Sequence, residues 1–264
     1  MAMLWVMMSA LCLFALSKVE AQTQETDQDY TLEAASTENP DGTLTITANS
    51  PRPLWQALNM LYSKYGIEVD YEDPHYSNDQ LYGPSGIGRR LRGGKFTATI
   101  PLNRSNSAAQ KENMLSSLVK QYNDIAPLKF KVYFHKSEDR VDVIPDNSYQ
   151  QPLLSTPVVI NGENLSVEDV VNQTTRQVAI RSGNCLERAG IIDNSLAAQK
   201  ASFKSAEALP AREVLAQVLD ELEMKKIWLV TYDPQSSCFH LGVFNAQQLV
   251  DNRVRPVPQT HITK

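Results

Sequence analysis

The sequence predicts an α+β protein with two tandem units, and two patterns lead to this prediction. Short segments of alternating apolar and polar residues, typical of half-buried strands, are separated by longer segments whose apolar residues recur every three or four positions, as in amphipathic helices. The order β-α-β, then β-α-β-β, occurs twice: equivalent helices start near residues 111 and 210, and equivalent hairpin turns at residues 135 and 233. We therefore expect two β-α-β/β-α-β-β units, each with two helices packed against small sheets.

The first unit is expected over residues 42–145. Pro53 presets the backbone at the start of its first helix, and Gly66 stands where a left-handed cap ends that helix. Ser107 and Gln110 match a capping box at the start of the second helix. Strands are predicted over residues 43–48, 67–71, 95–100, 128–134 and 140–144.

The second unit is expected over residues 156–245, after a linker at 146–155 and before a polar tail at 246–264. Ser166 and Asp169 form a second capping-box pattern, Gly183 ends that helix, and Pro210 opens the next one. Strands are predicted over residues 156–160, 185–188, 200–204, 226–232 and 238–244. The periodic faces predict Trp55, Phe130 and Trp228 to be core residues.

Composition limits the functional classes. The chain has 264 residues, 42% hydrophobic and 21% charged, with a formal net charge of −5. This balance excludes a chain that is disordered throughout, a collagen-like repeat and a membrane bundle. The chain has no strongly basic domain to bind a phosphate backbone, so we do not expect a nucleic acid as partner.

The N-terminus is typical of an export signal. Residues 1–16 form an apolar run that is too short to span a bilayer, and residues 19–21 approximate a small-x-small cleavage pattern. We predict a signal peptide over residues 1–21 that is cleaved between Ala21 and Gln22, leaving no stable membrane span. Residues 22–41 are polar and predict a flexible leader. The mature protein would be periplasmic or extracellular in a bacterium.

A family resemblance covers residues 43–244. Residues 53–71 read P-L-x-x-A-L-x-x-L-x-x-x-Y-G-I-x-V-x-Y, and residues 210–219 repeat part of this pattern as P-A-x-x-V-L-x-x-V-L. This arrangement resembles the short domain at the N-terminus of secretins and TonB-dependent transducers, here in tandem as in a group of exported, uncharacterised bacterial proteins. The resemblance implies a protein-interaction or signalling module of the cell envelope, with no catalytic residues and no cofactor.

Two cysteines remain after signal cleavage. In an oxidising compartment, Cys185 and Cys238 are more naturally a disulfide than a metal site or a nucleophile, and two independent buried thiols are the alternative. Cys238 and His240 share a strand face, so a hydrolase with a Cys nucleophile and a His base is a second alternative. We find no acid partner or oxyanion motif for it, and we do not expect an enzyme.

One basic cluster stands out in this acidic chain. Arg89, Arg90, Arg92 and Lys95 lie on a glycine-rich loop that also holds Tyr76 and Tyr82. A solvated loop tip is the plainer interpretation, but Tyr and Arg are enriched at contact surfaces, so these six residues are our candidate partner-contact loop.

The four histidines are far apart in the sequence and form no metal-type pair, so we expect no metal site and interpret each as a solvated loop or strand residue: His75, His135, His240 and His261. The sequence therefore predicts a non-enzymatic envelope protein that binds another protein. A small-ligand carrier with a cleft between the two units is the main alternative.

Overall fold

The helices lie where the apolar periodicity predicts them. The computed structural model describes residues 34–48, 52–76, 95–102, 107–135, 140–148, 150–162, 164–189, 199–200, 207–222 and 226–245. The helices in these ranges are α2 (Pro53–Tyr65), α4 (Ala108–Ile125), α5 (Val167–Ser182) and α7 (Ala211–Asp220), with a 3-10 turn, η1 (Leu153–Ser155). Together with the sheets described below, they confirm the α+β class.

Most of the predicted helix ends are confirmed. Gly66 and Gly183 both adopt left-handed backbone conformations, with φ of 64° and 71°, directly after α2 and α5. At the start of α5, Ser166 and Asp169 form the reciprocal hydrogen bonds of a capping box. The capping box predicted at Ser107 is wrong: its side chain makes no cap hydrogen bond, and its carbonyl oxygen accepts the backbone N–H of Gln110.

The strands form three sheets. The first has the order β1-β2-β4, the second β5-β6-β3-β10-β11-β8, and the third β7-β9. Their bounds are β1 Ala35–Glu38, β2 Thr43–Ala48, β3 Asp70–Glu72, β4 Phe96–Pro101, β5 Phe130–Phe134, β6 Val141–Pro145, β7 Pro157–Val158, β8 Cys185–Arg188, β9 Leu209–Pro210, β10 Lys226–Asp233 and β11 Cys238–Asn245.

The six-stranded sheet is built from both halves of the chain. The first half supplies β5, β6 and β3, in which an antiparallel hairpin is followed by a parallel strand, and the second half supplies β10, β11 and β8 in the same arrangement. Parallel pairing of β3 with β10 joins the two sets, with Tyr71 opposite Leu229. The chain thus has one sheet that runs across both halves, where we expected small sheets in each unit.

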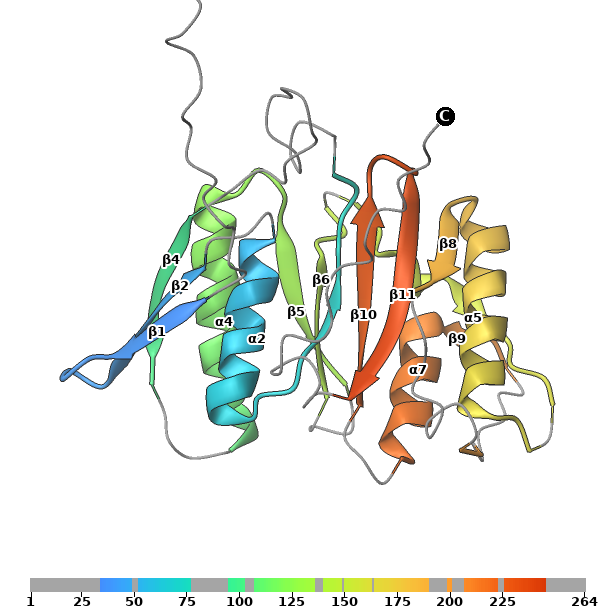
Figure 1. Ribbon diagram of the computed structural model, residues 1–264, viewed down its shortest axis with the longest axis horizontal. Helices are drawn as coiled ribbons and strands as arrows, with labels where there is room; N and C mark the ends of the chain where they lie inside the picture. Colours follow the sequence, from blue (N-terminus) through green and yellow to red (C-terminus); the bar gives the residue numbers. More distant parts are fainter. Residues whose placement is uncertain are drawn as a thin grey trace, which may run out of the picture. The chain divides into compact units, whose positions relative to one another are not determined.

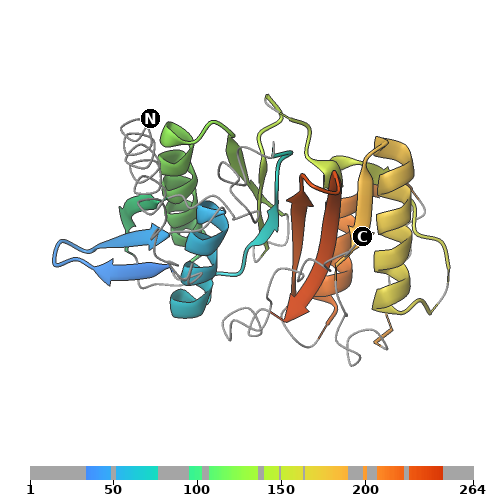
Figure 2. The same ribbon diagram turned by 45° about the horizontal axis from the view of Figure 1, so that its top comes forward.

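The helices pack on these sheets in two groups. In Figure 1, α2 and α4 lie side by side next to the β1-β2-β4 sheet, and α4 also contacts β5. Helices α5 and α7 contact each other, and α5 packs beside β8 (Figures 1 and 2). Each group covers one apolar cluster, and the first-half cluster also includes two residues of the second half, Ile227 and Leu229 of β10. Trp55, Phe130 and Trp228 are buried, as predicted.

The structure differs from some of the predicted boundaries. The leader predicted over residues 22–41 is wrong at its end, because Ala35–Glu38 forms β1 and pairs with β2; its side chains are mostly exposed, so the strand leaves no apolar pattern in the sequence. Within the predicted linker, Leu153 and Leu154 are buried. The signal peptide with Ala21 and Gln22, residues 201–204 of the strand predicted over 200–204, and the tail at 246–264 lie outside the described residues.

Candidate functional site

The predicted contact loop is described only at its two ends. Tyr76, one of the six residues predicted to contact a partner, is buried in the second-half apolar cluster, so its side chain is not available for that contact. The Arg52 guanidinium lies over the ring of Tyr76, with its carbon 5.9 Å from the ring centroid. Lys95 is exposed immediately before β4. Tyr82, Arg89, Arg90 and Arg92 lie outside the described residues, so the contact role of this loop stays a prediction.

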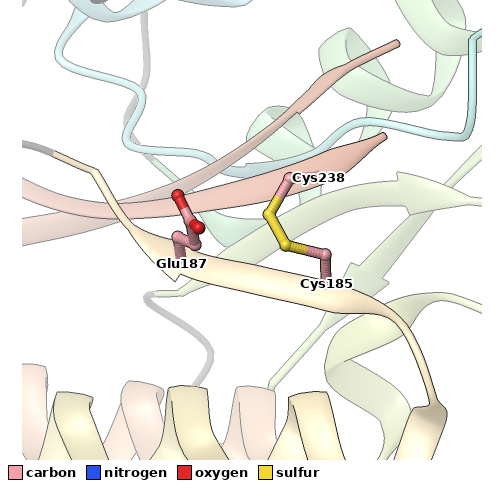
Figure 3. A group of neighbouring side chains, drawn as sticks. All are labelled: Cys185, Glu187 and Cys238. Carbon is pink, nitrogen blue, oxygen red and sulfur yellow. A yellow bond between two sulfur atoms is a disulfide. The ribbon is translucent and has the colours of Figure 1, made fainter. Parts of the chain in front are cut away.

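The two cysteines form a disulfide. Cys185 of β8 and Cys238 of β11 stand directly opposite each other, with Cα atoms 4.6 Å apart (Figure 3). The bond fastens the end strand of the six-stranded sheet to its neighbour. It also removes the free thiol that the Cys–His hydrolase needs, so Cys238 cannot act as a nucleophile in this state.

A buried network of charged side chains crosses the join between the halves. Arg140, directly before β6, donates to Asp70 of β3 at 2.6 Å, to Asp220 of α7 at 2.9 Å and to the backbone oxygen of Lys226. The other carboxylate oxygen of Asp70 accepts the backbone N–H of Trp228 at 2.7 Å. Burial raises the pKa of Asp70 to about 7, although the Arg140 charge opposes the rise.

His135 belongs to this network, so its interpretation as a solvated residue is wrong. It is 4% exposed, its Nε2 lies 2.8 Å from Asp142 and its Nδ1 lies 3.2 Å from Glu213 of α7. Glu213 also accepts a hydrogen bond from Tyr133 at 2.6 Å. Burial disfavours the charged imidazole, but the two carboxylates outweigh burial and raise the pKa of His135.

Glu72 fastens β3 to the segment that links the halves. Its carboxylate accepts the backbone N–H groups of Leu153 and Leu154, the latter at 3.2 Å. Burial raises the pKa of Glu72 to about 7, against the nearby Arg212 guanidinium and these two N–H donors. Arg212 itself binds the hydroxyl of Ser155.

Asp73, just after β3, makes further contacts between the two halves. Oδ2 of Asp73 accepts hydrogen bonds from Nε of Arg52 at 2.5 Å and from the backbone N–H of Tyr232 at 2.9 Å. The network therefore consists of carboxylates that bind backbone N–H groups and arginines across the β3–β10 junction, with little access to solvent. These contacts hold the two halves of the six-stranded sheet together, so we interpret the network as structural. The signal in the sequence was the three carboxylates of residues 70–73 at the end of the strand predicted over residues 67–71.

Side-chain amides bind outward backbone groups at two strand edges and in the segment after β7. Gln121 of α4 binds both the N–H and the carbonyl oxygen of Thr99 on β4, and Asn123 does the same at Phe130 on β5. From α5, Gln177 binds Val159 and Gln173 binds Asn161 with the same pair of bonds. A partner strand could not pair at these positions, because their backbone groups already have partners.

The edge of β5 beyond Phe130 is different. At the two ends of the β5–β6 ladder, the carbonyl oxygen of Lys129 accepts the backbone N–H of Asp146, and the backbone N–H of His135 donates to the carbonyl oxygen of Arg140. With the antiparallel register, the odd-numbered residues of β5 therefore face β6 and the even-numbered ones face outward. The N–H and carbonyl groups of Val132 and Phe134 therefore point away from the sheet, and in the described part of the chain no strand pairs with them. Both side chains are partly buried against the first-half cluster.

The opposite end of the sheet is less suited to receive a strand. On β8, Arg188 forms an ion pair with Glu168 of α5, and Glu187 is exposed. Charged side chains on a short strand discourage pairing with another chain. At the edge of the three-stranded β1-β2-β4 sheet, β1 carries only small and polar residues. Thus, among the strands that the structure describes, β5 has the most apolar open edge.

Comparison of the chain with protein-family models, with curated proteins and with solved structures gave no match. Among the residues described, no helix is long and apolar enough to cross a bilayer.

Proposed function

We propose that the protein is an exported, non-enzymatic protein-interaction module of the bacterial cell envelope, and that its partner adds an extended segment to the sheet at β5. The outward backbone groups of Val132 and Phe134 carry this proposal. Main-chain hydrogen bonds would supply affinity, and side chains alternating along the added strand would supply specificity.

Three further observations support it. The amides of Gln121 and Asn123 bind the backbone groups of Thr99 on β4 and Phe130 on β5, whereas no strand in the described part of the chain pairs with the outward groups of Val132 and Phe134. The Cys185–Cys238 disulfide fits an oxidising compartment outside the cytoplasm. The resemblance of residues 43–244 to the short N-terminal domain of secretins and TonB-dependent transducers favours an envelope interaction role.

The test uses proline, which lacks the backbone N–H. At Val132 the N–H points outward, so Val132→Pro removes a donor for the partner and keeps the β5–β6 ladder. The matched control is Arg188→Pro, because Arg188 holds the equivalent outward position on β8: the N–H of the next residue, Ala189, binds Leu241. Crosslinked capture from native envelope should lose the partner with the Val132 variant and retain it with the control.

A third bait separates the edge from the predicted contact loop by changing Arg89, Arg90 and Arg92 to Ser. Loss of the partner with this bait alone would place the contact on the loop and refute the role of β5. Equal capture by all baits would refute both sites. Thermal melting of each variant shows whether the fold is retained.

A further inference from the structure

Four side chains with metal-binding groups lie on one face of the β8–β11 pair. Cys185 and Glu187 are two residues apart on β8, and Cys238 and His240 are two residues apart on β11, so each pair points to one side of its strand. The parallel register sets Cys185 opposite Cys238 and Glu187 opposite His240. The four residues thus occupy a two-by-two block across adjacent strands.

Their ligand atoms are close together. The two Sγ atoms and a carboxylate oxygen of Glu187 all lie within 4.8 Å of one another. The Nδ1 of His240 is 3.9 Å from Oε2 of Glu187. Figure 3 shows the Glu187 carboxylate on the same side of β8 as the disulfide. In a tetrahedral zinc site, with Zn–S of about 2.3 Å and Zn–N of about 2.0 Å, ligand atoms are roughly 3.3–3.8 Å apart. Reduction of the disulfide would let the two sulfurs move apart, and small side-chain rotations would then bring the four ligand atoms to this spacing.

The block is rigid on one side and accessible on the other. Leu186, Phe239 and Leu241 alternate with the four residues and point to the opposite face, where they are buried in the second-half apolar cluster. Cys185 and Glu187 are exposed, the side chain of His240 is 24% exposed, and Cys238 is buried. A cation and a small reductant can therefore approach from the side of Cys185 and Glu187, while the sheet holds the backbones of the four residues in register.

We propose that Cys185, Glu187, Cys238 and His240 bind one Zn²⁺ ion when the disulfide is reduced. Two thiolates, one imidazole and one carboxylate suit this borderline-soft cation. The oxidised and metal-bound forms exclude each other, because the sulfurs cannot be bonded to one another and also serve as separate thiolate ligands. The proposal does not depend on strand addition at β5.

A dithiol supplies the reducing step. It transfers two electrons and two protons: the Cys185–Cys238 bond breaks, two thiols form, and the dithiol closes to its own disulfide. Binding of Zn²⁺ then releases the two thiol protons to solvent as the Zn–S bonds form. Reoxidation by a disulfide of the same class expels the metal and restores the crosslink.

The experiment titrates Co²⁺ into the full chain carrying Cys12→Ser, so that Cys185 and Cys238 are the only cysteines. The dithiol is removed before titration under anaerobic conditions. We expect one Co²⁺ per chain, with a thiolate-to-cobalt charge-transfer band and tetrahedral d–d bands that Zn²⁺ abolishes. The oxidised chain should show neither band. Glu187→Gln and His240→Gln should each weaken binding by about tenfold or more.

The matched control is His75→Gln. The His75 ring packs against Phe239, on the other face of β11 from His240, so this variant should bind Co²⁺ like the parent chain. Absence of the charge-transfer band in the reduced, folded chain overturns the proposal. Wild-type affinity in both the Glu187 and His240 variants also overturns it, because the metal would then be held by the two thiolates alone. Circular dichroism checks the fold, and a reduced chain that unfolds before it binds metal contradicts a preformed site.

Discussion

Replacement of Glu72 by glutamine should change how stability depends on pH. Glu72 is fully buried, and burial raises its pKa from 4.5 to about 7 in the folded protein. Between these two values the folded state binds more protons at this site than the unfolded state. Stability contributed by the protonated carboxyl is therefore present at low pH and is lost as the pH rises through about 7.

The size of the effect follows from the shift. One pKa unit corresponds to about 1.4 kcal/mol, so ionisation of Glu72 should cost roughly 3 kcal/mol of unfolding free energy between pH 4.5 and pH 8. The neutral amide of Glu72→Gln keeps an oxygen that can accept one of the Leu153 and Leu154 N–H groups. The variant should resemble the wild type near pH 4.5 and exceed its stability near pH 8.

Urea unfolding followed by tryptophan fluorescence at a series of pH values measures the difference. The raised pKa values of Asp70 and His135 act in the same direction, so the wild type should lose stability across this range even beyond the contribution of Glu72. Only the difference between wild type and variant isolates Glu72. Glu187→Gln, which removes an exposed carboxyl, should keep the wild-type slope. Parallel curves for wild type and Glu72→Gln would refute the reasoning.

Three further predictions concern stability. Ser166→Ala should cost about 1 kcal/mol by removing a capping box, whereas Ser107→Ala should be nearly neutral because that side chain makes no cap bond; thermal unfolding of both variants compares them. Arg140→Ala should cost about 3–5 kcal/mol in urea unfolding at pH 8, because Asp70 stays buried without its cation; a loss below 1 kcal/mol would contradict this. Reduction of the disulfide, whose cysteines are 53 residues apart, should cost about 4 kcal/mol, and an unchanged denaturation midpoint would contradict this.

Local patterns in the sequence were sufficient for the helices. Residues 53–65 become α2 because their apolar spacing, Pro53 and Gly66 all favour the same helix. The capping pattern at Ser166 succeeded and the one at Ser107 failed, although both match the motif. The motif shows which bonds are possible, while the side-chain rotamers decide which bonds form.

The candidate site was only partly predictable. The disulfide followed from cysteine number and compartment, but the sequence left two separate thiols open as an alternative until the β8–β11 register placed Cys185 opposite Cys238. His135 was misinterpreted because its carboxylate partners come from another strand and from α7, far away in the sequence. The open edge of β5 could not be inferred, since strand order depends on pairing between distant segments.

The sequence by itself determined the α+β class, the order of most elements and the faces of the helices, because spacing, caps and turn residues act within a few positions of one another. The tertiary structure alone decided that β3 and β10 pair, that the carboxylates of residues 70–73 are buried at this junction, and that β5 and β8 form the two ends of the sheet. These features depend on contacts between residues separated by up to about 160 positions, and on the burial that raises the pKa of Asp70 and Glu72. No local pattern carries that information.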